Sequence, residues 1–325
     1  MRRRALLGAL LAMPWFSACE TGGPAESAET GKPQPSKIPG PAKIPGPAEA
    51  TATPSDTDTA AKLSTAAAAL RKLEDRFEVR LGASATDTVT GLSLGHRQDE
   101  RFAMCSTFKT YAVAAVLRSH PVSTGFLDHR VRFTRADLVP HSPITETHVG
   151  TGMTVAELCR AALLQSDNAA SNLLLDLLGG TSAVTELARS IGDQTTRLDD
   201  KEPELNNVTP GTERNTTTPT GMASGYRALL LSDALAPPER EQLTRWMKAN
   251  RTGTNRIRAG LPSGWTAADK TGTGDYAAAN HVAIAWPPTG HPLSIALFSD
   301  KPSLNATHNE KVLAAATRII TRALI

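Results

Sequence analysis

Hydrophobic and polar positions follow two different periods along this chain. Over residues 60–77 apolar side chains recur every three or four positions, which predicts an amphipathic helix. Two short strand candidates follow at residues 78–84 and 92–94, and the glycine-containing stretch between them predicts a hairpin. Helical spacing then dominates from residue 107 to about residue 250.

A period of two replaces the helical spacing after residue 264. The alternation predicts three strands and a last amphipathic helix, at residues 265–273, 281–286, 293–298 and 309–323. Neighbouring strands joined by short turns pair antiparallel, and helices at both ends of the chain can cover one face of the sheet. We therefore predict the α/β class, with a five-stranded antiparallel sheet flanked by helices.

The helical middle of the chain interrupts this sheet. The α/β part would consist of residues of about 61–103 and 251–325, and the inserted all-α part of about 104–250. Within the insertion, Thr154 and Glu157 have the spacing of a capping box that opens a helix. Because the two sheet segments must meet in space, we expect a cleft against the insertion and the active site in that cleft.

The first 60 residues differ in composition from the rest. Three arginines, an apolar run and small residues before Cys19 predict an export signal over residues 1–19, whose apolar part is too short to span a bilayer. The arginines are typical of a twin-arginine signal, and residues 16–19 resemble a lipobox in which Cys19 would carry a lipid. Residues 20–60 are rich in proline, alanine and threonine, which predicts a disordered tether. We expect an exported protein, either secreted or held outside the cytoplasmic membrane by this lipid.

Composition and charge exclude several other classes of function. The formal net charge is +3, and subtracting the three arginines at positions 2–4 leaves zero, so nothing indicates a nucleic-acid partner. None of the eight histidines forms a His-x-His or His-Glu-x-x-His pattern, so we expect no metal site. Besides Cys19, the chain contains only Cys105 and Cys159, both in apolar helical contexts. We predict that these two thiols are free and buried.

One stretch of the chain has the pattern of a catalytic nucleophile. Ser106 stands three residues before Lys109 at the start of an apolar run, so on a helix the ammonium can reach the hydroxyl. A serine at a helix start also lies near unpaired N–H groups and the positive end of the helix dipole, which favour an anionic oxygen. This is the chemistry of an acyl-enzyme, although Ser-x-x-Lys alone is commonly a helix cap beside a surface lysine.

Two further motifs make the pattern specific. Ser-Asp-Asn at residues 166–168 and Lys-Thr-Gly at residues 270–272 complete the signature of class A β-lactamases and penicillin-binding proteins. From about residue 61 onward the chain resembles a class A serine β-lactamase of the actinobacterial type, within the superfamily of penicillin-binding proteins and serine transferases. Residues 256–260 and 270–276 carry the actinobacterial likeness. The resemblance implies a monomeric hydrolase of β-lactam antibiotics that confers resistance and needs no cofactor.

The resemblance implies a role for each matching residue. Ser106 would attack the lactam carbonyl, and the backbone N–H groups of Ser106 and Thr273 would form the oxyanion hole. Lys109 would hold and help deprotonate Ser106, with Glu202 acting through a water as the rival base. Ser166 would relay a proton to the departing nitrogen, and Asn168 would recognise the amide side chain of the substrate. His141 would form a wall of the cleft. The substrate carboxylate would be bound by Lys270, Thr271, Gly272, Thr273 and Arg256.

Glu202 and Asn206 distinguish a hydrolase from a peptidase. Four residues apart, they would hold one water against the acyl ester, with Glu202 as general base. Without this water an acyl-enzyme would accumulate, as in penicillin-binding proteins. Two alternatives therefore stay open: a D-alanyl-D-alanine peptidase of the penicillin-binding type, and a non-enzymatic surface lipoprotein that senses β-lactams or peptidoglycan.

Some positions depart from the pattern of the family. Ala279 stands where many members have an arginine, and Arg256 would supply that charge. Val113 stands where some members have the cysteine partner of Cys159, so that disulfide is expected to be absent.

The segment 197–219, here called the Glu202 loop, departs as well. Asp200 and Asn215 stand where many members pair arginine with aspartate across the neck of the loop. We therefore expect this neck to lack an ion pair. We also expect the loop to be more mobile for that reason.

Overall fold

The computed structural model describes residues 56–325. The expected export signal, Cys19 and nearly all of the expected tether lie outside these residues. Helix α1 (Asp56–Phe77) begins before residue 61, so residues 56–60, which we assigned to the tether, are helical instead. Acidic residues in the first turn of a helix interact favourably with its dipole, and Asp58 fills that place here.

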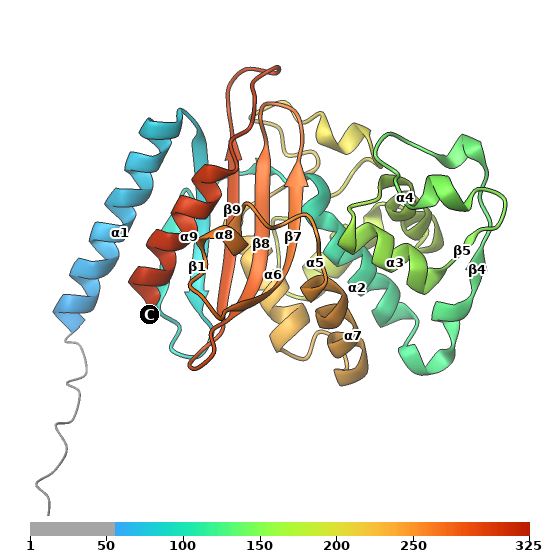
Figure 1. The fold of residues 1–325 in the computed structure, drawn as a ribbon, viewed down its shortest axis with the longest axis horizontal. Helices are drawn as coiled ribbons and strands as arrows, with labels where there is room; N and C mark the ends of the chain where they lie inside the picture. The colour runs from blue at the N-terminus through green and yellow to red at the C-terminus, as the bar shows by residue number, and fades with distance from the viewer. Residues whose placement is uncertain (1–55) are drawn as a thin grey trace, which may run out of the picture. The chain divides into compact units, whose positions relative to one another are not determined.

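Five antiparallel strands form the central sheet, in the order β2-β1-β9-β8-β7 (Figure 1). They are β1 (Arg80–Asp87), β2 (Ser93–His96), β7 (Thr266–Thr273), β8 (Ala279–Trp286) and β9 (Leu293–Asp300). β1 pairs with β9 along its whole length, so strands from the two ends of the domain lie side by side. The predicted α/β class and five-stranded antiparallel sheet are confirmed.

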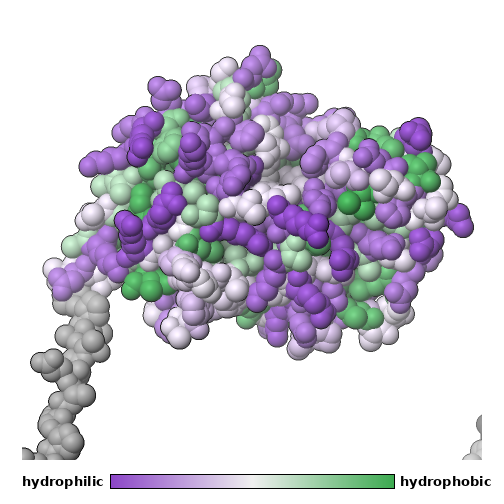
Figure 2. Space-filling model, viewed as in Figure 1, coloured by the Kyte–Doolittle hydropathy of each residue, from purple (hydrophilic) through white to green (hydrophobic). Residues whose placement is uncertain are grey.

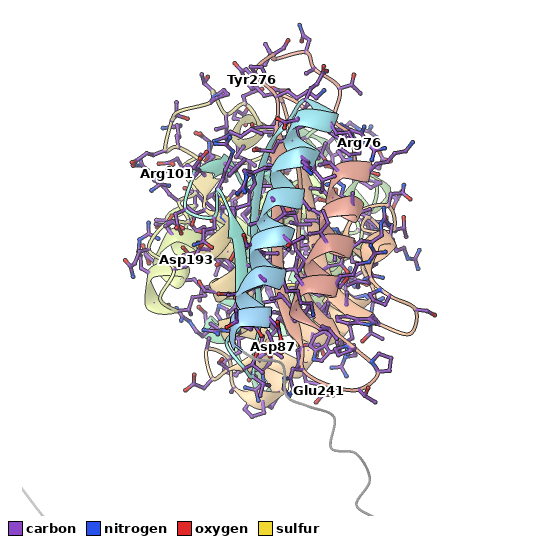
Figure 3. All side chains as sticks on the ribbon, turned by 90° about the vertical axis from the view of Figure 1, so that its left-hand side faces the viewer. Arg76, Asp87, Arg101, Asp193, Glu241 and Tyr276 are labelled. Carbon is purple, nitrogen blue, oxygen red and sulfur yellow. The ribbon has the colours of Figure 1, made fainter. Side chains whose placement is uncertain are left out.

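Helices α1 and α9 (Lys311–Leu324) cover one face of this sheet and pack against each other (Figures 1 and 3). Leu70 of α1 and Leu313 and Ile320 of α9 are fully buried in the core between the helices and the sheet. The prediction that the terminal helices cover one face is therefore confirmed.

The inserted helices lie on the other side of the sheet. They are α2 (Lys109–Ser119), α3 (Val155–Leu164), α4 (Asn168–Leu177), α5 (Ser182–Ser190), α6 (Pro219–Leu231) and α7 (Pro237–Lys248), and the short α8 (Ile257–Gly260) precedes β7. Helix α2 is buried over most of its length, as a run without a polar face requires. The predicted capping box at Thr154 and Glu157 is present at the start of α3.

The insertion is not entirely helical, which corrects our expectation. It contains the ribbon of β4 (Arg130–Val131) with β5 (Met153–Thr154), and its strand β6 (Thr216–Thr217) pairs with β3 (Phe102–Ala103), which lies just before the insertion. Strands of two residues are too short to show an alternating pattern, so the sequence gives no sign of them. The 3₁₀ helices are η1 (Cys105–Phe108), η2 (Val122–Thr124), η3 (Phe126–Asp128), η4 (Arg135–Asp137), η5 (Thr145–His148) and η6 (Glu204–Asn206).

The face of the described domain shown in Figure 2 is mostly polar, with apolar residues scattered between polar ones. Val89, Leu304 and Ile325 are the exposed large hydrophobic residues in this part of the chain. None of the helices within residues 56–325 combines the length and the hydropathy that crossing a membrane requires. Cys105 and Cys159 are free and buried, as predicted.

Candidate active site

Ser106 lies in the 3₁₀ helix η1, which runs directly into α2. It is therefore one turn before the α-helix and not its first residue. Cys105, immediately before it, has a φ of 44°, in the left-handed region that non-glycine residues rarely adopt. This turn places Ser106 at the wall of a cleft between the sheet and the inserted helices.

The cleft has a volume of about 360 Å³ and is lined by nine of the twelve predicted site residues. These are Ser106, His141, Ser166, Asn168, Asn206, Arg256, Thr271, Gly272 and Thr273, and Thr252 lines it with them. The other three, Lys109, Glu202 and Lys270, are buried behind the cleft wall, with at most 2% of their surface exposed. The sequence motifs therefore meet at one place, as predicted.

The Ser106 hydroxyl donates a hydrogen bond to Oε1 of Glu202 at 3.1 Å. The ammonium of Lys109 lies 3.1 Å from the same oxygen, and no hydrogen bond joins Lys109 to Ser106 in the part of the chain that the structure describes. The expected direct contact is therefore replaced by a shared carboxylate. A buried ammonium is stabilised most by charged and carbonyl acceptors, and Lys109 also donates to the Ser166 carbonyl and to Asn168 Oδ1, at 2.8 and 2.6 Å.

Two buried ammonium groups flank Ser166. Lys270 Nζ donates to Ser166 Oγ at 2.9 Å, and Lys109 Nζ lies 3.5 Å from the same oxygen. Burial lowers the pKa of Lys270 well below its usual value, and the nearby positive charge of Lys109 lowers it further. Burial also lowers the pKa of Lys109, although the Glu202 carboxylate opposes this shift. Ser166 is thus placed between two groups that can supply a proton.

The lowered pKa of Lys270 predicts an alkaline limit to the binding of a substrate carboxylate. As the pH rises through this pKa, Lys270 loses its charge, so KM should rise by up to about ten-fold per pH unit above the pKa. The measurement is KM between pH 6 and 10 for a carboxylate-bearing substrate and for the ester of the same compound. Lys270→Arg is the control, because a guanidinium keeps its charge to roughly pH 12 and should give a flat profile. An alkaline rise of equal size for the ester would contradict the assignment.

Glu202 is held from both sides by amide side chains. Its backbone N–H donates to Asn172 Oδ1 at 3.0 Å, and Asn172 Nδ2 donates to the Glu202 carbonyl at 2.8 Å. Asn206 Nδ2 donates to the other carboxylate oxygen, Oε2. Asn172 was missed by the sequence reasoning. Its signal was its place on α4, four residues after Asn168 and so on the same helix face.

Glycines allow β7 to run against the nucleophile turn. A Cβ atom on Gly272 would lie 2.8 Å from the Met104 carbonyl oxygen, and one on Gly274 would lie 2.7 Å from Cys105 Sγ. Real Cβ atoms do not approach that closely, so a side chain at either position would push the strand away. The end of β7 therefore lies close to the turn that carries Ser106, and an oxyanion hole shared by Ser106 and Thr273 would require such an approach.

Arg256 joins the cleft from the loop before β7. Its guanidinium donates to the Gly272 and Asn280 carbonyls at 2.7 and 2.8 Å and to Thr273 Oγ1 at 2.7 Å. Glu310 accepts from Arg256 Nε at 2.8 Å. The positive charge of Arg256 thus lies beside Thr273 and close to β8, the strand that contains Ala279. We expected Arg256 to supply the charge of the arginine that many family members have at the position of Ala279.

Two further residues of the cleft are Thr252, which the sequence did not predict, and His141, which it predicted as a wall residue. The Thr252 hydroxyl lies 2.6 Å from that of Thr271, and no motif marks Thr252 in the sequence. His141 is exposed, with its Nε2 3.2 Å from the Gln165 carbonyl oxygen, and this position agrees with the predicted wall residue.

The neck of the Glu202 loop carries an ion pair, contrary to our expectation. Arg214, the neighbour of Asn215, donates through Nε to Asp200 Oδ2 at 2.7 Å and through a second nitrogen to Oδ1. Asn215 also donates to Asp200 at 2.7 Å. The expectation rested on positions 200 and 215 alone, whereas the partner of Asp200, Arg214, is the residue before position 215.

This pair predicts the behaviour of the loop in solution. Arg214→Ala should speed amide exchange across residues 197–219 by roughly two- to five-fold, the range that an exposed ion pair supports. The double exchange Asp200→Arg with Arg214→Asp should restore much of the protection. Arg197→Ala is the matched control, because within the described residues the Arg197 side chain forms its ion pair with Asp199, on its own side of the neck. Equal exchange in the wild type and Arg214→Ala would show that the pair does not restrain the loop.

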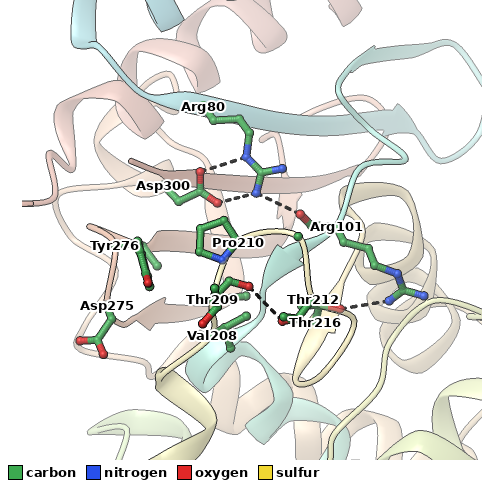
Figure 4. Close-up of a pocket in the computed structure, with 13 residues that line it drawn as sticks. Arg80, Arg101, Val208, Thr209, Pro210, Thr212, Thr216, Asp275, Tyr276 and Asp300 are labelled. Atoms are coloured by element: carbon green, nitrogen blue, oxygen red, sulfur yellow. Dashed lines mark hydrogen bonds and ion pairs between the residues drawn. The ribbon is translucent and has the colours of Figure 1, made fainter. Parts of the chain in front are cut away.

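The outer part of the Glu202 loop, residues 208–212, lies over the end of the sheet (Figure 4). There Arg80 of β1 donates to Asp300 of β9 and to the Arg101 carbonyl, both at 3.0 Å. Arg101 in turn donates to Thr216 Oγ1 at 3.0 Å. The space enclosed between the loop and these residues is about 10 Å³, enough for about one water, so the loop lies close against them there.

Comparisons with known proteins agree with this geometry. The model of the family described as "Beta-lactamase enzyme family" matches residues 65–324. β-Lactamase FAR-1 of Nocardia farcinica is 52% identical over 259 residues, which cover 80% of this chain and 83% of that protein. β-Lactamase AST-1 of Nocardia asteroides is 52% identical over 253 residues, 78% of this chain and 82% of that protein.

Solved structures give the same result. The β-lactamase from Desulfarculus baarsii superposes with a TM-score of 0.78 at 45% identity, over 80% of this chain and 97% of that one. The β-lactamase from Streptosporangium roseum has the same TM-score at 44% identity, over 80% of this chain and 98% of that one. The likeness therefore extends over almost the whole of both solved chains.

Proposed function

This chain belongs to the β-lactamase enzyme family, and we propose from that membership that Ser106 opens the lactam ring and that Glu202 directs the water that releases the product. The protein is a hydrolase that acts on the cyclic amide of β-lactams. The observation that supports this division of roles is the hydrogen bond of 3.1 Å from the Ser106 hydroxyl to the Glu202 carboxylate. A serine that donates to a buried carboxylate has its proton acceptor already in place.

Acylation begins when Ser106 Oγ attacks the lactam carbonyl carbon and its proton passes to Glu202. The developing oxyanion accepts hydrogen bonds from the N–H groups of Ser106 and Thr273. The ring C–N bond then breaks, and the nitrogen takes the proton of Ser166. Lys109, which lies within 3.5 Å of both Ser166 Oγ and Glu202 Oε1, gives Ser166 a new proton and takes up the proton that Glu202 received from Ser106. The proton lost by Ser106 thus balances the one gained by the nitrogen, and Glu202 is a carboxylate again before deacylation.

Deacylation uses the same carboxylate a second time. Glu202 and Asn206 hold a water against the acyl ester, and Glu202 removes its proton as the water attacks. The carboxylate is held in place for this by Asn172 and Asn206. The substrate carboxylate is bound by Lys270, Thr271, Thr273 and Arg256, and Gly272 lets β7 come close to the turn that carries Ser106. Asn168 binds the amide side chain of the substrate, and His141 forms a wall of the cleft.

Steady-state turnover of a chromogenic cephalosporin, with intact-protein mass followed in parallel, tests this function. Sustained turnover with no lasting adduct is the expected result. One burst with a persistent adduct would indicate a penicillin-binding peptidase. No turnover and no adduct would indicate a binding protein, and either outcome would overturn the proposal.

We further propose that the protein is exported as a monomer and tethered by a lipid on Cys19. The support is in the sequence, where the signal-like residues 1–19 precede a proline-rich stretch that can hold a domain away from a membrane surface. The mass of the mature N-terminal peptide, measured on protein from membranes and from culture medium, distinguishes a lipidated Cys19 from a secreted form.

A further inference from the structure

A buried histidine lies behind the carboxylate-binding end of the cleft. His281 of β8 is fully buried, and in the register of the sheet it lies opposite Thr271 of β7. Its Nε2 is 2.7 Å from Asp269 Oδ2, and its Nδ1 accepts from the Ile257 backbone N–H at 3.0 Å. The acceptor role of Nδ1 fixes the tautomer, so the neutral ring carries its proton on Nε2 and donates it to Asp269.

The two partners of His281 are the neighbours of two residues that bind the substrate carboxylate. Asp269 immediately precedes Lys270 on β7, and Ile257 immediately follows Arg256 at the start of α8. One imidazole thus connects the backbone that carries the lysine to the backbone that carries the arginine. Burial would raise the pKa of the Asp269 carboxyl, but its contacts with His281 and Arg258 outweigh this and keep it ionised.

The same aspartate also organises the hydroxyl end of the cleft. Asn250 Nδ2 donates to Asp269 Oδ2 at 2.7 Å, and Asn250 Oδ1 accepts from the Thr252 hydroxyl at 2.8 Å. Thr252 in turn contacts the hydroxyl of Thr271, which faces the cleft.

The loop before α8 is packed directly on this pair. A Cβ atom on Gly253 would lie 2.4 Å from Asp269 Oδ2 and 2.8 Å from His281 Cε1, so only glycine leaves the loop where it is. The network is therefore closely packed and has one geometry.

We propose that His281 is a positioning residue for carboxylate recognition, which sets the distance of Arg256 from Lys270 and Thr271. The inference rests on the proposed function, because the carboxylate in question is that of the β-lactam. His281 does not touch the substrate. It acts by holding the Ile257 N–H, and so the first turn of α8, at a fixed place relative to β7.

Two substitutions separate the two hydrogen bonds of the ring. Glutamine can place an amide N–H near the Nε2 position and keeps the bond to Asp269, while asparagine can place an oxygen near the Nδ1 position and keeps the bond from Ile257. His281→Gln should raise KM for a carboxylate-bearing β-lactam about five-fold with little change in kcat, because one hydrogen bond that places Arg256 is lost. His281→Asn should retain KM better. For the ester of the same β-lactam, neither variant should change KM.

Ser294→Ala is the matched control, since Ser294 is also buried on the same sheet and its hydroxyl donates to the Ala223 carbonyl. Equal rises in KM for the Gln and Asn variants, an equal rise in KM for the ester, or no change in KM for His281→Gln would overturn the proposal.

If His281→Gln does not fold, ¹⁵N NMR of histidine-labelled wild-type protein still tests the geometry. A neutral Nε2–H tautomer supports it, and a proton on Nδ1 overturns it. Failure of the wild type to turn over would count against the proposed function instead.

Discussion

Ser106→Ala is expected to abolish turnover, lowering kcat by on the order of 10⁶-fold, as loss of the nucleophile does in serine hydrolases. The covalent mass adduct should disappear with it. The physical reason is that Ser106 donates its hydrogen bond to a carboxylate, whereas the other serine at the cleft, Ser166, accepts one from the Lys270 ammonium. Only Ser106 of these two is paired with a group that can take its proton.

Chromogenic turnover and intact mass, measured on the same preparation, check this result. Ser224→Ala is a suitable control, because the Ser224 hydroxyl donates to the Gly221 carbonyl within its own helix, α6. This control should keep wild-type kcat. Substantial turnover by Ser106→Ala would mean that the nucleophile had been wrongly assigned.

The elements of the fold were predictable where their signals were local. The alternation in β7, β8 and β9 and the capping box before α3 depend on neighbouring residues, and each was found. The ribbon of β3 with β6 was not, because its two short strands are more than a hundred residues apart and neither has a periodic pattern. That ribbon is a long-range contact, which joins the end of the Glu202 loop to the strand before Ser106.

The residues of the site also differ in whether the sequence could identify them. Motif residues such as Ser106 and Lys270 could be identified from the sequence, because their identity and order are specific. Their partners could not, because each partner is selected by competition among groups that only the fold brings together. Lys109 was expected to reach Ser106, yet Glu202, Ser166 and Asn168 from distant segments supply better acceptors for its ammonium. The same holds for Arg214 at the loop neck.

Glu202→Gln is expected to leave acylation measurable while deacylation falls by roughly 10³-fold, the share that a positioned general base contributes. Deacylation fails because a glutamine cannot take a proton from water. Acylation continues for a reason that the site itself supplies. Among the groups that oppose the burial-driven fall in the pKa of Lys109, Glu202 has the largest effect, so without its charge that pKa falls further. A neutral Lys109 can then accept the Ser106 proton.

The expected observation is a burst of one equivalent of product per enzyme, followed by very slow steady-state turnover. The protein should carry a stable adduct with the mass of the intact lactam. Glu204→Gln, an exposed change of the same chemistry two residues along the loop, should turn over like the wild type. Undiminished turnover in Glu202→Gln would overturn the assignment of the water. Loss of the burst as well would show that Lys109 cannot replace Glu202 as the base for acylation.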